Sequence, residues 1–476
     1  MSKTAFDAVV VGSGPNGLAA GIALQQRGHS VLLIEARDEI GGGMRSAELT
    51  LPGFVHDICS AIHPMAANSP FFSTLPLGDH GLEYIYPPVN AAHPFDDGTA
   101  AVLAGSVQDT ARLLGVDEGA YLRLMEPLVR DWPLLAPDVL GPLHFPKYPL
   151  EMAAFGLKAL PSAVTLAHRF RTDAARGLWA GMAAHSMLPL TKATTAAIGL
   201  VLMVSGHLKG WPLPKGGTAM LGRALASYFV SLGGKMQTNF EVKSLDQLPS
   251  SRAVLLDLTP RQLLQIGGHR WSSVYQTQLS RYRYGMGVFK IDWALDGAIP
   301  FTAEECRMAG TVHIGGKLEE IVASERTIWD GGHPEKPYIL LAQQSLFDAT
   351  RAPEGKQVAW AYCHVPNGST KDLTGVIESQ IERFAPGFRE RVLARSVMNT
   401  EQLEQYNANY IGGDINGGAI DIAQLFTRPA LRSSPYRTSE KGIYICSAST
   451  PPGGGVHGMC GYYAAQRVLK DLFDGQ

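Results

Sequence analysis

Cysteine and long apolar runs are scarce in this sequence. Only five of its 476 residues are cysteines, and they form neither a C-x-x-C pair nor the spacing of a metal site. We therefore expect no bound metal, and an odd number of dispersed cysteines is typical of a reducing compartment such as the cytoplasm. The longest apolar run, residues 196–204, is too short to span a membrane. The first predicted strand begins within a few residues of Met1, so we expect no signal or transit peptide.

An excess of charge of either sign is also absent. The chain has 41 lysines and arginines against 43 aspartates and glutamates, and no block of like charges. Without a basic surplus we expect no nucleic-acid partner. Apolar residues make up 45% of the chain and charged ones 18%, so the sequence predicts a globular protein of two or three domains with a large buried core.

The most informative pattern is a glycine turn between two apolar strands. Residues 8–11 predict a strand, which runs into the G-x-G-x-x-G sequence of residues 12–17 and a helix over 15–27. A second apolar run, residues 31–34, ends at Glu35. Strand, turn, helix, strand and terminal acid in this order predict a βαβ unit that binds a dinucleotide.

Each role in such a unit falls to a residue of the expected type. Gly12 permits the tight turn, Gly14 lets the backbone approach a pyrophosphate, and Gly17 lets the helix pack closely on the sheet. Free N–H groups at the helix N-terminus would bind the pyrophosphate, and Glu35 would accept hydrogen bonds from the adenosine ribose. An acid at that place disfavours a ribose phosphate, so NADP is not expected, whereas FAD and NAD both fit.

The rest of the chain predicts a helical region and a second sheet. Residues 106–206 have a helical pattern rich in leucine, alanine and methionine. Later segments alternate in the manner of an antiparallel sheet, and a last strand and helix would complete the first sheet. The predicted strands lie near residues 235–240, 253–258, 287–293, 338–341, 358–364 and 443–446, and the predicted helices over 219–232, 373–384, 389–397 and 457–473.

A second glycine-rich loop, residues 453–455, precedes the C-terminal helix. A helix that starts near His457 has unpaired N–H groups and a positive dipole end, which suit the negative charge of a reduced flavin. The glycines would let the backbone pass against a flat ring. No second G-x-G-x-x-G follows a strand, which favours one bound redox cofactor over a two-nucleotide reductase. Taken alone, the loop is explained equally well as an ordinary strand–loop–helix connection.

Five segments resemble the phytoene-desaturase-like FAD-dependent oxidoreductases, relatives of carotenoid desaturases, retinol saturases and amine oxidases. They are VVVGSGPNGLAAGIALQQRGHSVLLIEARDEIGGG, PGFVHDICSAIHPMAANSPFF, WPLPKGGTAMLGRAL, NYIGGDINGG and GIYICSASTPPGGGVHGMCGYYAAQRVL. The resemblance implies an α/β fold with a Rossmann-type, glutathione-reductase-like FAD-binding domain, an antiparallel-sheet substrate domain and a helical cap. The FAD-binding domain would be discontinuous, with residues 1–75, 207–270 and 405–476, and the substrate and cap domain would take residues 76–206 and 271–404.

The resemblance also implies an FAD site built from both ends of the chain. Carried over by position, it comprises Gly12, Gly14, Pro15, Gly17, Glu35 and Ala36 for the ADP half, Gly42 and Arg45 for the phosphates or ribityl chain, Val242 for the adenine, and Gly455, Val456, His457, Gly458 and Met459 for the isoalloxazine. Arg45 could instead form a surface salt bridge.

Members of such a family transfer hydride between flavin and carbon, so the resemblance implies desaturation, saturation or isomerisation of a hydrophobic isoprenoid-like or acyl-like substrate. His457 and His63 are the predicted catalytic residues, because imidazole titrates near neutrality and both lie in loops expected near the flavin. His56 and Asp57 share one of these loops. Each of the four could instead only hydrogen-bond a loop or the cofactor. The electron acceptor stays open between oxygen, a quinone and a protein.

Two other functions stay open. A flavin-retaining scaffold with little turnover would use its helical face to bind a partner. An amine oxidase would need aromatic residues flanking the C-terminal glycine loop, whereas Tyr462 and Tyr463 lie inside the predicted helix. The helical region combines apolar and basic residues between 155 and 171, so it predicts either a cap packed on the core or a surface for peripheral contact with a membrane.

Overall fold

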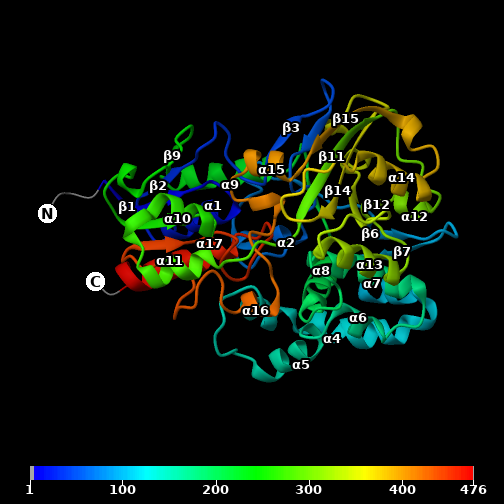
Figure 1. Ribbon diagram of the computed structural model, residues 1–476, viewed down its shortest axis with the longest axis horizontal. Coiled ribbons are helices and arrows are strands. Elements are labelled where there is room, and N and C mark those ends of the chain that lie inside the picture. The colour runs from blue at the N-terminus through cyan, green and yellow to red at the C-terminus, as the bar shows by residue number, and fades with distance from the viewer. Residues whose placement is uncertain (1–4, 475–476) are drawn as a thin grey trace.

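The computed structural model describes residues 5–474 as two large sheets joined by helices and loops (Figure 1). The first sheet has five parallel strands in the order β16-β10-β1-β2-β9, and the second has seven strands in the order β15-β11-β14-β13-β12-β6-β7. Most of the helices between α4 and α8 lie below the second sheet in the view of Figure 1. This arrangement confirms the expected combination of a Rossmann-type unit, a second sheet and a helical cap.

The first sheet is apolar on both faces, as a parallel sheet covered by helices requires. Ala8 and Val10 face the helices α1, α9 and α17, whereas Val9 and Val11 face α10 and α11. Its strands are β1 (Phe6–Val11), β2 (Val31–Ile34), β9 (Lys235–Gln237), β10 (Ser251–Leu256) and β16 (Ile443–Ile445). Its helices are α1 (Pro15–Gln25), α9 (Ala219–Ser231), α10 (Pro260–Gly267), α11 (Ser273–Ser280) and α17 (Met459–Val468).

Two glycines let the chain ends approach each other. A Cβ on Gly17 would lie 2.0 Å from the carbonyl oxygen of Gly12, and one on Gly461 would lie 1.8 Å from the carbonyl oxygen of Asn16. Both distances are far below a normal contact, so only glycine allows α1 to pack on β1 and α17 to pack on α1. The C-terminal strand β16 pairs with β10, so the first sheet takes its edge from the end of the chain, as expected.

The second sheet is antiparallel except for the parallel pair β6–β12. One face packs on α12 (Glu304–Arg307) and α14 (Thr374–Phe384) in a separate apolar core, and the other faces the first sheet and the cap. Its strands are β6 (Val89–Pro94), β7 (Ala100–Leu103), β11 (Gly287–Leu295), β12 (Ala309–Ile314), β13 (Ile339–Ala342), β14 (Gln357–Val365) and β15 (Val392–Met398).

One predicted helix is wrong. The segment 389–397 forms a single short turn and then β15, which pairs antiparallel with β11 at the edge of the second sheet. Alternate residues of β15 are exposed, such as Leu393 and Arg395, which is the pattern of an edge strand with one side in water. Its arginines and leucine favour a helix locally, but pairing with β11 overrides that propensity.

Residues 106–206 are helical, as predicted. The helices are α3 (Val107–Leu113), α4 (Glu118–Val139), α5 (Pro149–Ala159), α6 (Ala163–Ala167), α7 (Asp173–Ala184) and α8 (Thr195–Lys209). Helices α7 and α8 are nearly buried, whereas most of α5 is exposed or only partly buried. Within residues 5–474, no helix combines the length and apolar character needed to cross a bilayer.

The remaining elements are the helix α13 and several short segments around these layers. They are β3 (Ser46–Glu48), β4 (Val55–Asp57), α2 (Pro64–Ala67), β5 (Tyr84–Ile85), β8 (Leu213–Pro214), α13 (Leu318–Trp329), α15 (Thr400–Tyr406) and α16 (Ile422–Leu425). The pair β3–β4 and the pair β5–β8 each form a small antiparallel ribbon. Helix α2 follows β4 and lies between the two large sheets (Figure 1).

Candidate active site

A cavity of about 730 Å³ extends from the glycine turn of the first sheet to the inner face of the second sheet. Its wall includes ten of the predicted cofactor residues, namely Gly12, Gly14, Pro15, Glu35, Ala36, Gly42, Arg45, Val242, Gly455 and Val456. The other four are not part of this wall: Gly17 lets α1 pack on β1, and His457, Gly458 and Met459 form the end of the preceding loop and the start of α17. The two ends of the chain therefore meet at one cavity.

The glycine turn is shaped for an anionic group. Gly14 caps the N-terminus of α1 without a side-chain hydrogen bond. A Cβ on Gly14 would lie 2.8 Å from Oδ2 of Asp257, and one on Gly42 would lie 2.9 Å from Cα of Gly14, so glycine keeps this end of the cavity open. A helix N-terminus beside open space is the usual site of a pyrophosphate, and these residues fit the ADP half of a dinucleotide.

Glu35 stands at the end of β2 with its carboxylate fixed. Its Oε2 accepts hydrogen bonds from the backbone N–H of Ser13 (3.0 Å) and from the Ser13 hydroxyl (2.5 Å). Its Oε1 accepts from the N–H of Arg37 (3.0 Å) and lies 3.4 Å from Nη2 of Arg45. Arg45 is only 5% exposed, so its contact with Glu35 is buried and not a surface salt bridge.

Asp257 also borders the cavity, although no sequence motif identified it. It follows β10, and its Oδ2 accepts a hydrogen bond from the N–H of Gly17 at 3.0 Å. Burial, with a smaller effect from the nearby charge of Glu35, raises the pKa of Asp257 to about 7. Because no charge or turn motif surrounds it in the sequence, only the parallel pairing of β1 and β10 could have placed it beside the glycine turn.

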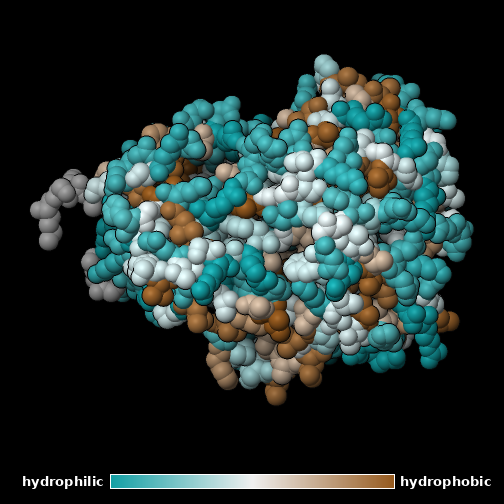
Figure 2. Space-filling view, in the orientation of Figure 1, coloured by the Kyte–Doolittle hydropathy of each residue, from teal (hydrophilic) through white to brown (hydrophobic). Residues whose placement is uncertain are grey.

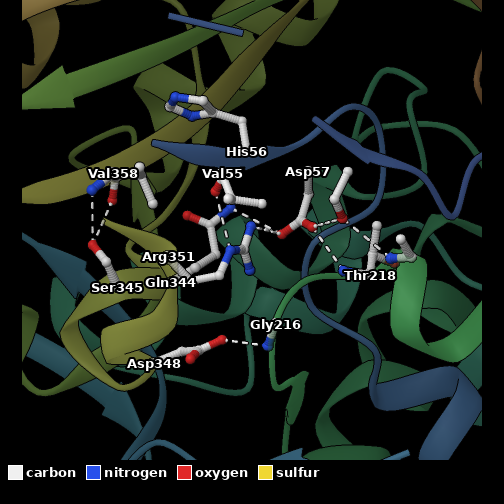
Figure 3. Close-up of polar contacts among 12 residues, drawn as sticks. Val55, His56, Asp57, Gly216, Thr218, Gln344, Ser345, Asp348, Arg351 and Val358 are labelled. Atoms are coloured by element: carbon white, nitrogen blue, oxygen red, sulfur yellow. Dashed lines mark hydrogen bonds and ion pairs between the residues drawn. The ribbon is translucent and has the colours of Figure 1, made fainter. Parts of the chain in front are cut away.

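Asp57 holds the loop after β4 to three other segments (Figure 3). Its Oδ1 accepts hydrogen bonds from the N–H of Thr218 and the hydroxyl of Ser46, both at 2.8 Å. Its Oδ2 accepts from Nε2 of Gln344 at 3.3 Å and pairs with Arg351 at 2.9 Å. Although burial opposes the charge, Arg351 and these donors hold the pKa of Asp57 below its usual value. Its carboxylate is therefore engaged in positioning the loop.

The histidines predicted near the flavin have different surroundings. His63 borders the cavity, its Nε2 lies 2.7 Å from the Thr218 hydroxyl, and burial lowers its pKa to about 4. His56 lies outside the wall, where its Nε2 contacts the Thr50 hydroxyl at 2.8 Å, and burial and the charge of Lys290 lower its pKa to about 3. His457 is buried in the loop before α17, and its Nδ1 accepts a hydrogen bond from the N–H of Met459 at 3.0 Å. The catalytic roles of His63 and His457 stay predictions.

The far half of the cavity is formed by residues that the sequence did not single out. Strands β12 to β14 supply Thr311, Leu340, Trp360 and Tyr362, and the cap supplies His185 and Leu202. Met65 of α2 and Trp211 after α8 complete it. Trp360, Tyr362 and His364 alternate along β14 and share its inner face. That alternation is a visible signal, but only the sheet order shows that this face borders the cavity.

The comparisons with known proteins agree with this geometry. The family model of an NAD(P)-binding Rossmann-like domain matches residues 10–75. A mouse protein named pyridine nucleotide-disulfide oxidoreductase domain-containing protein 2 is 27% identical over 99% of this chain and 94% of its own length. The lycopene-forming phytoene desaturase of a Paracoccus species is 24% identical over 99% of both chains. A solved oxidoreductase from Methanosarcina mazei has a TM-score of 0.67 at 15% identity, over 98% of this chain and 100% of that one.

These likenesses confirm the expected resemblance to phytoene-desaturase-like oxidoreductases and the expected Rossmann-type fold. They also support a flavin or nucleotide as cofactor. Within residues 5–474, no group of three or more histidine, cysteine, aspartate or glutamate side chains is arranged to hold a metal ion.

Proposed function

We propose that this relative of the phytoene desaturases is a flavoenzyme that binds FAD and transfers hydride between the flavin and a hydrophobic, isoprenoid-like or acyl-like substrate. The observation that carries the proposal is the single cavity that joins the glycine turn, the loop before α17 and the inner face of the second sheet. A cofactor with an ADP half and a flat redox half would have its two halves at the first two of these places. The third place leaves a wall for the substrate.

The residues present fit FAD. The N-terminus of α1 would bind the pyrophosphate, Glu35 the adenosine ribose and the backbone of Val242 the adenine. Gly455 and Val456 would lie against the isoalloxazine. When bound, the flavin would supply the acceptor or donor of a hydride.

In the proposed reaction, the side chains of the cavity would position the reacting carbon atom of the substrate and exclude water. Met65, Leu202, Leu340 and Trp360 give the far half of the cavity an apolar character that suits a hydrocarbon chain. His63 would stay neutral there, because burial lowers its pKa to about 4. With Nε2 beside the Thr218 hydroxyl, it could orient a polar atom or pass a proton, which is the role proposed for it.

Purification and spectroscopy test this function directly. We expect the purified protein to be yellow, to release FAD on denaturation, and to show a reversible change of the flavin spectrum with a lipid extract or a chemical reductant. A folded preparation that never takes up flavin would exclude the proposal. A flavin that stays bound but responds to neither lipid nor reductant would favour the scaffold alternative.

We also propose a peripheral contact with a membrane, because the helical region exposes both apolar and basic side chains. Leu143, Phe145, Leu150 and Leu157, which we call the apolar ridge, are exposed in and before α5, with Phe145 at 85%. Figure 2 shows apolar residues at the lower edge of the molecule, where α5 lies in Figure 1. Lys147 and Lys158 lie in the same segment, so the ridge combines apolar and basic side chains. Such a surface would hold the protein on a source of hydrophobic substrate.

A further inference from the structure

The carboxyl group of Asp257 lies at the same helix end as the expected pyrophosphate site. Asp257 directly follows β10, which pairs in parallel with β1, so it stands beside the glycine turn after β1. Its Oδ2 accepts a hydrogen bond from the N–H of Gly17 at 3.0 Å. Asp257 and Gly14 both border the cavity, and the Cβ that Gly14 lacks would lie 2.8 Å from Oδ2. An anion bound at this turn would therefore be a close neighbour of the Asp257 carboxyl group.

Asp257 also competes with an anion for hydrogen-bond donors. A helix leaves the N–H groups of its first turn unpaired, and these donors are the ones that bind a pyrophosphate. In α1 the first residue is Pro15, which has no N–H, and the N–H of Gly17 already donates to Asp257. The N–H groups of Gly14 and Asn16 are left for a ligand. The carboxyl group and a pyrophosphate would thus share one helix end.

The groups packed around this carboxyl group supply no positive charge. Glu35, at the end of β2, adds a second negative charge, and burial raises the pKa values of the thiols of Cys446 after β16 and Cys460 in α17, which stay neutral. Asn409 donates to the backbone carbonyl oxygen of Asp257 at 2.9 Å, not to the carboxyl group. Among residues 5–474, no lysine, arginine or histidine holds this carboxyl group in its charged form. An ionised Asp257 would therefore repel a pyrophosphate without a cation of its own to offset the charge.

A proton on Asp257 removes this repulsion. Burial raises the pKa of Asp257 to about 7, so the free protein gains and loses this proton in the neutral range. The negative charges of a pyrophosphate would raise that pKa further, because like charges disfavour the ionised form. Oδ2 accepts from Gly17, whereas Oδ1 makes no hydrogen bond with any described residue, so Oδ1 is the atom that would hold the proton. The neutral acid would keep its contact with Gly17 and tolerate the anion.

We propose that Asp257 couples cofactor binding to a proton: its carboxyl group takes up one proton from water when the pyrophosphate of the cofactor binds at the N-terminus of α1, and the protein loses the cofactor as the pH rises above neutrality. The proposal rests on the proposed function in placing a pyrophosphate at this turn. It does not depend on which dinucleotide carries that pyrophosphate. The charge of Asp257 thereby sets the affinity of the cofactor site.

Flavin retention at different pH values tests the proposal. The holoprotein is dialysed against buffers with a fixed concentration of free FAD, and the bound fraction gives a dissociation constant at each pH. Because the carboxyl group keeps its proton in the complex, this constant should rise about fiftyfold between pH 7 and pH 9. In Asp257→Asn, which keeps an acceptor for Gly17 but cannot ionise, the constant should change less than about threefold. Asp38→Asn, at an exposed site, should behave like the native protein.

A purely structural role of Asp257 gives a different result. If the carboxylate only capped α1, Asp257→Asn would bind FAD more weakly at every pH and keep the pH dependence of the native protein. That outcome, or a native dissociation constant that does not change between pH 7 and pH 9, would overturn the proposal.

The proton itself can be counted in the native protein. ADP-ribose carries the same pyrophosphate without a flavin, and its phosphates do not titrate between pH 6 and pH 9. Calorimetric titration of flavin-free protein with ADP-ribose at pH 8, in buffers with different ionisation enthalpies, gives the number of protons taken up. We expect nearly one proton, and an uptake of none would overturn the proposal even if the asparagine variant does not fold.

The two ligands separate this inference from the flavin function. Proton uptake with ADP-ribose in a protein that never takes up FAD would refute the flavin function and leave this inference standing. Binding of FAD without proton uptake and without pH dependence would do the reverse.

Discussion

Asp57 and Arg351 form an ion pair of 2.9 Å in which neither side chain is exposed to water. Asp57 is the last residue of β4, and the loop that follows it borders the cavity. Arg351 lies in the second of two short helical turns that follow β13. Arg351 also donates from Nε to the carbonyl oxygen of Val55 at 3.0 Å. The pair therefore ties the end of β4 to the segment that follows β13 in the second sheet (Figure 3).

Removing Arg351 should destabilise the whole protein. In Arg351→Met the carboxylate of Asp57 stays buried without its cation, and breaking one partner of a buried pair costs about 3–5 kcal/mol. Urea denaturation followed by circular dichroism measures this loss. The double variant Asp57→Asn with Arg351→Met should recover part of it, because it leaves no unpaired charge. Lys215→Met, at an exposed ion pair with Glu83, is the control and should unfold like the native protein.

Glu35 should control how much flavin the protein retains. Its carboxylate is held by Ser13 and Arg37 at the end of β2, so Glu35→Ala removes both the acceptor for a ribose and the order of the turn. Loss of hydrogen bonds to a charged group costs about 1.5–3 kcal/mol, which weakens binding about ten- to a hundredfold. The ratio of flavin to protein absorbance after dialysis measures the effect. Glu48→Ala, at an exposed position of β3, should keep its flavin, and equal retention in both variants would contradict the ribose contact proposed for Glu35.

The pKa of Asp257 gives the stability a pH dependence. In the folded state it is raised to about 7, so between its ordinary value near 3.8 and pH 7 the unfolded chain releases a proton that the folded one keeps. Its contribution to stability is therefore largest in acid and is lost as the pH rises to 7. We expect Asp257→Asn to gain about 3 kcal/mol of unfolding free energy relative to the native protein on going from pH 5 to pH 8. The exposed variant Asp38→Asn should show no such gain.

The first sheet was predictable from sequence because the patterns that specify its first strands lie close together in the chain. The turn of residues 12–17 and the acid at Glu35 lie within one βαβ unit, and the structure places β1, α1 and β2 within two residues of the expected ranges. The C-terminal strand and helix were also identifiable, because a glycine loop separates two apolar patterns there. These elements form where short-range patterns and the final packing agree.

The far half of the cavity was not predictable, because its residues meet only through long-range pairing. Thr311, Leu340 and Trp360 lie on three strands, and His185 follows a helix more than a hundred residues earlier. The helix predicted over residues 389–397 was wrong for the same reason. Its local propensity is helical, and only pairing with β11 makes the segment a strand. Sequence patterns specify elements, whereas sheet order decides which faces border a cavity.

We expect Gly181→Ala to destabilise the protein, although the same substitution stabilises most helices. Alanine at an interior helix position normally stabilises by up to about 1 kcal/mol over glycine. At Gly181 a methyl group would lie 3.0 Å from Nδ1 of His313 and 3.1 Å from Nδ1 of His93, so Gly181→Ala must displace the histidines and should lower the melting temperature. Gly156→Ala in α5 is the matched control, because its methyl group would meet only Leu160 at 3.9 Å. That variant should be as stable as the native protein or more so. If both variants gained stability alike, the space between the two imidazoles would not be as tight as described.

The apolar ridge should carry membrane binding. Burying a leucine or phenylalanine side chain is worth about 1.5–3 kcal/mol, so four such residues can hold the protein on a bilayer. We expect the native protein to sediment with vesicles of phosphatidylglycerol and phosphatidylcholine, and the variant with serine at Leu143, Phe145, Leu150 and Leu157 to remain in the supernatant with its flavin content unchanged. Val274→Ser, at an exposed apolar residue of α11 beside the first sheet, should sediment like the native protein. High salt should weaken binding only in part, because Lys147 and Lys158 supply attraction to the anionic lipid while the ridge supplies burial. Binding by the serine variant that equals that of the native protein would show that the ridge has another role.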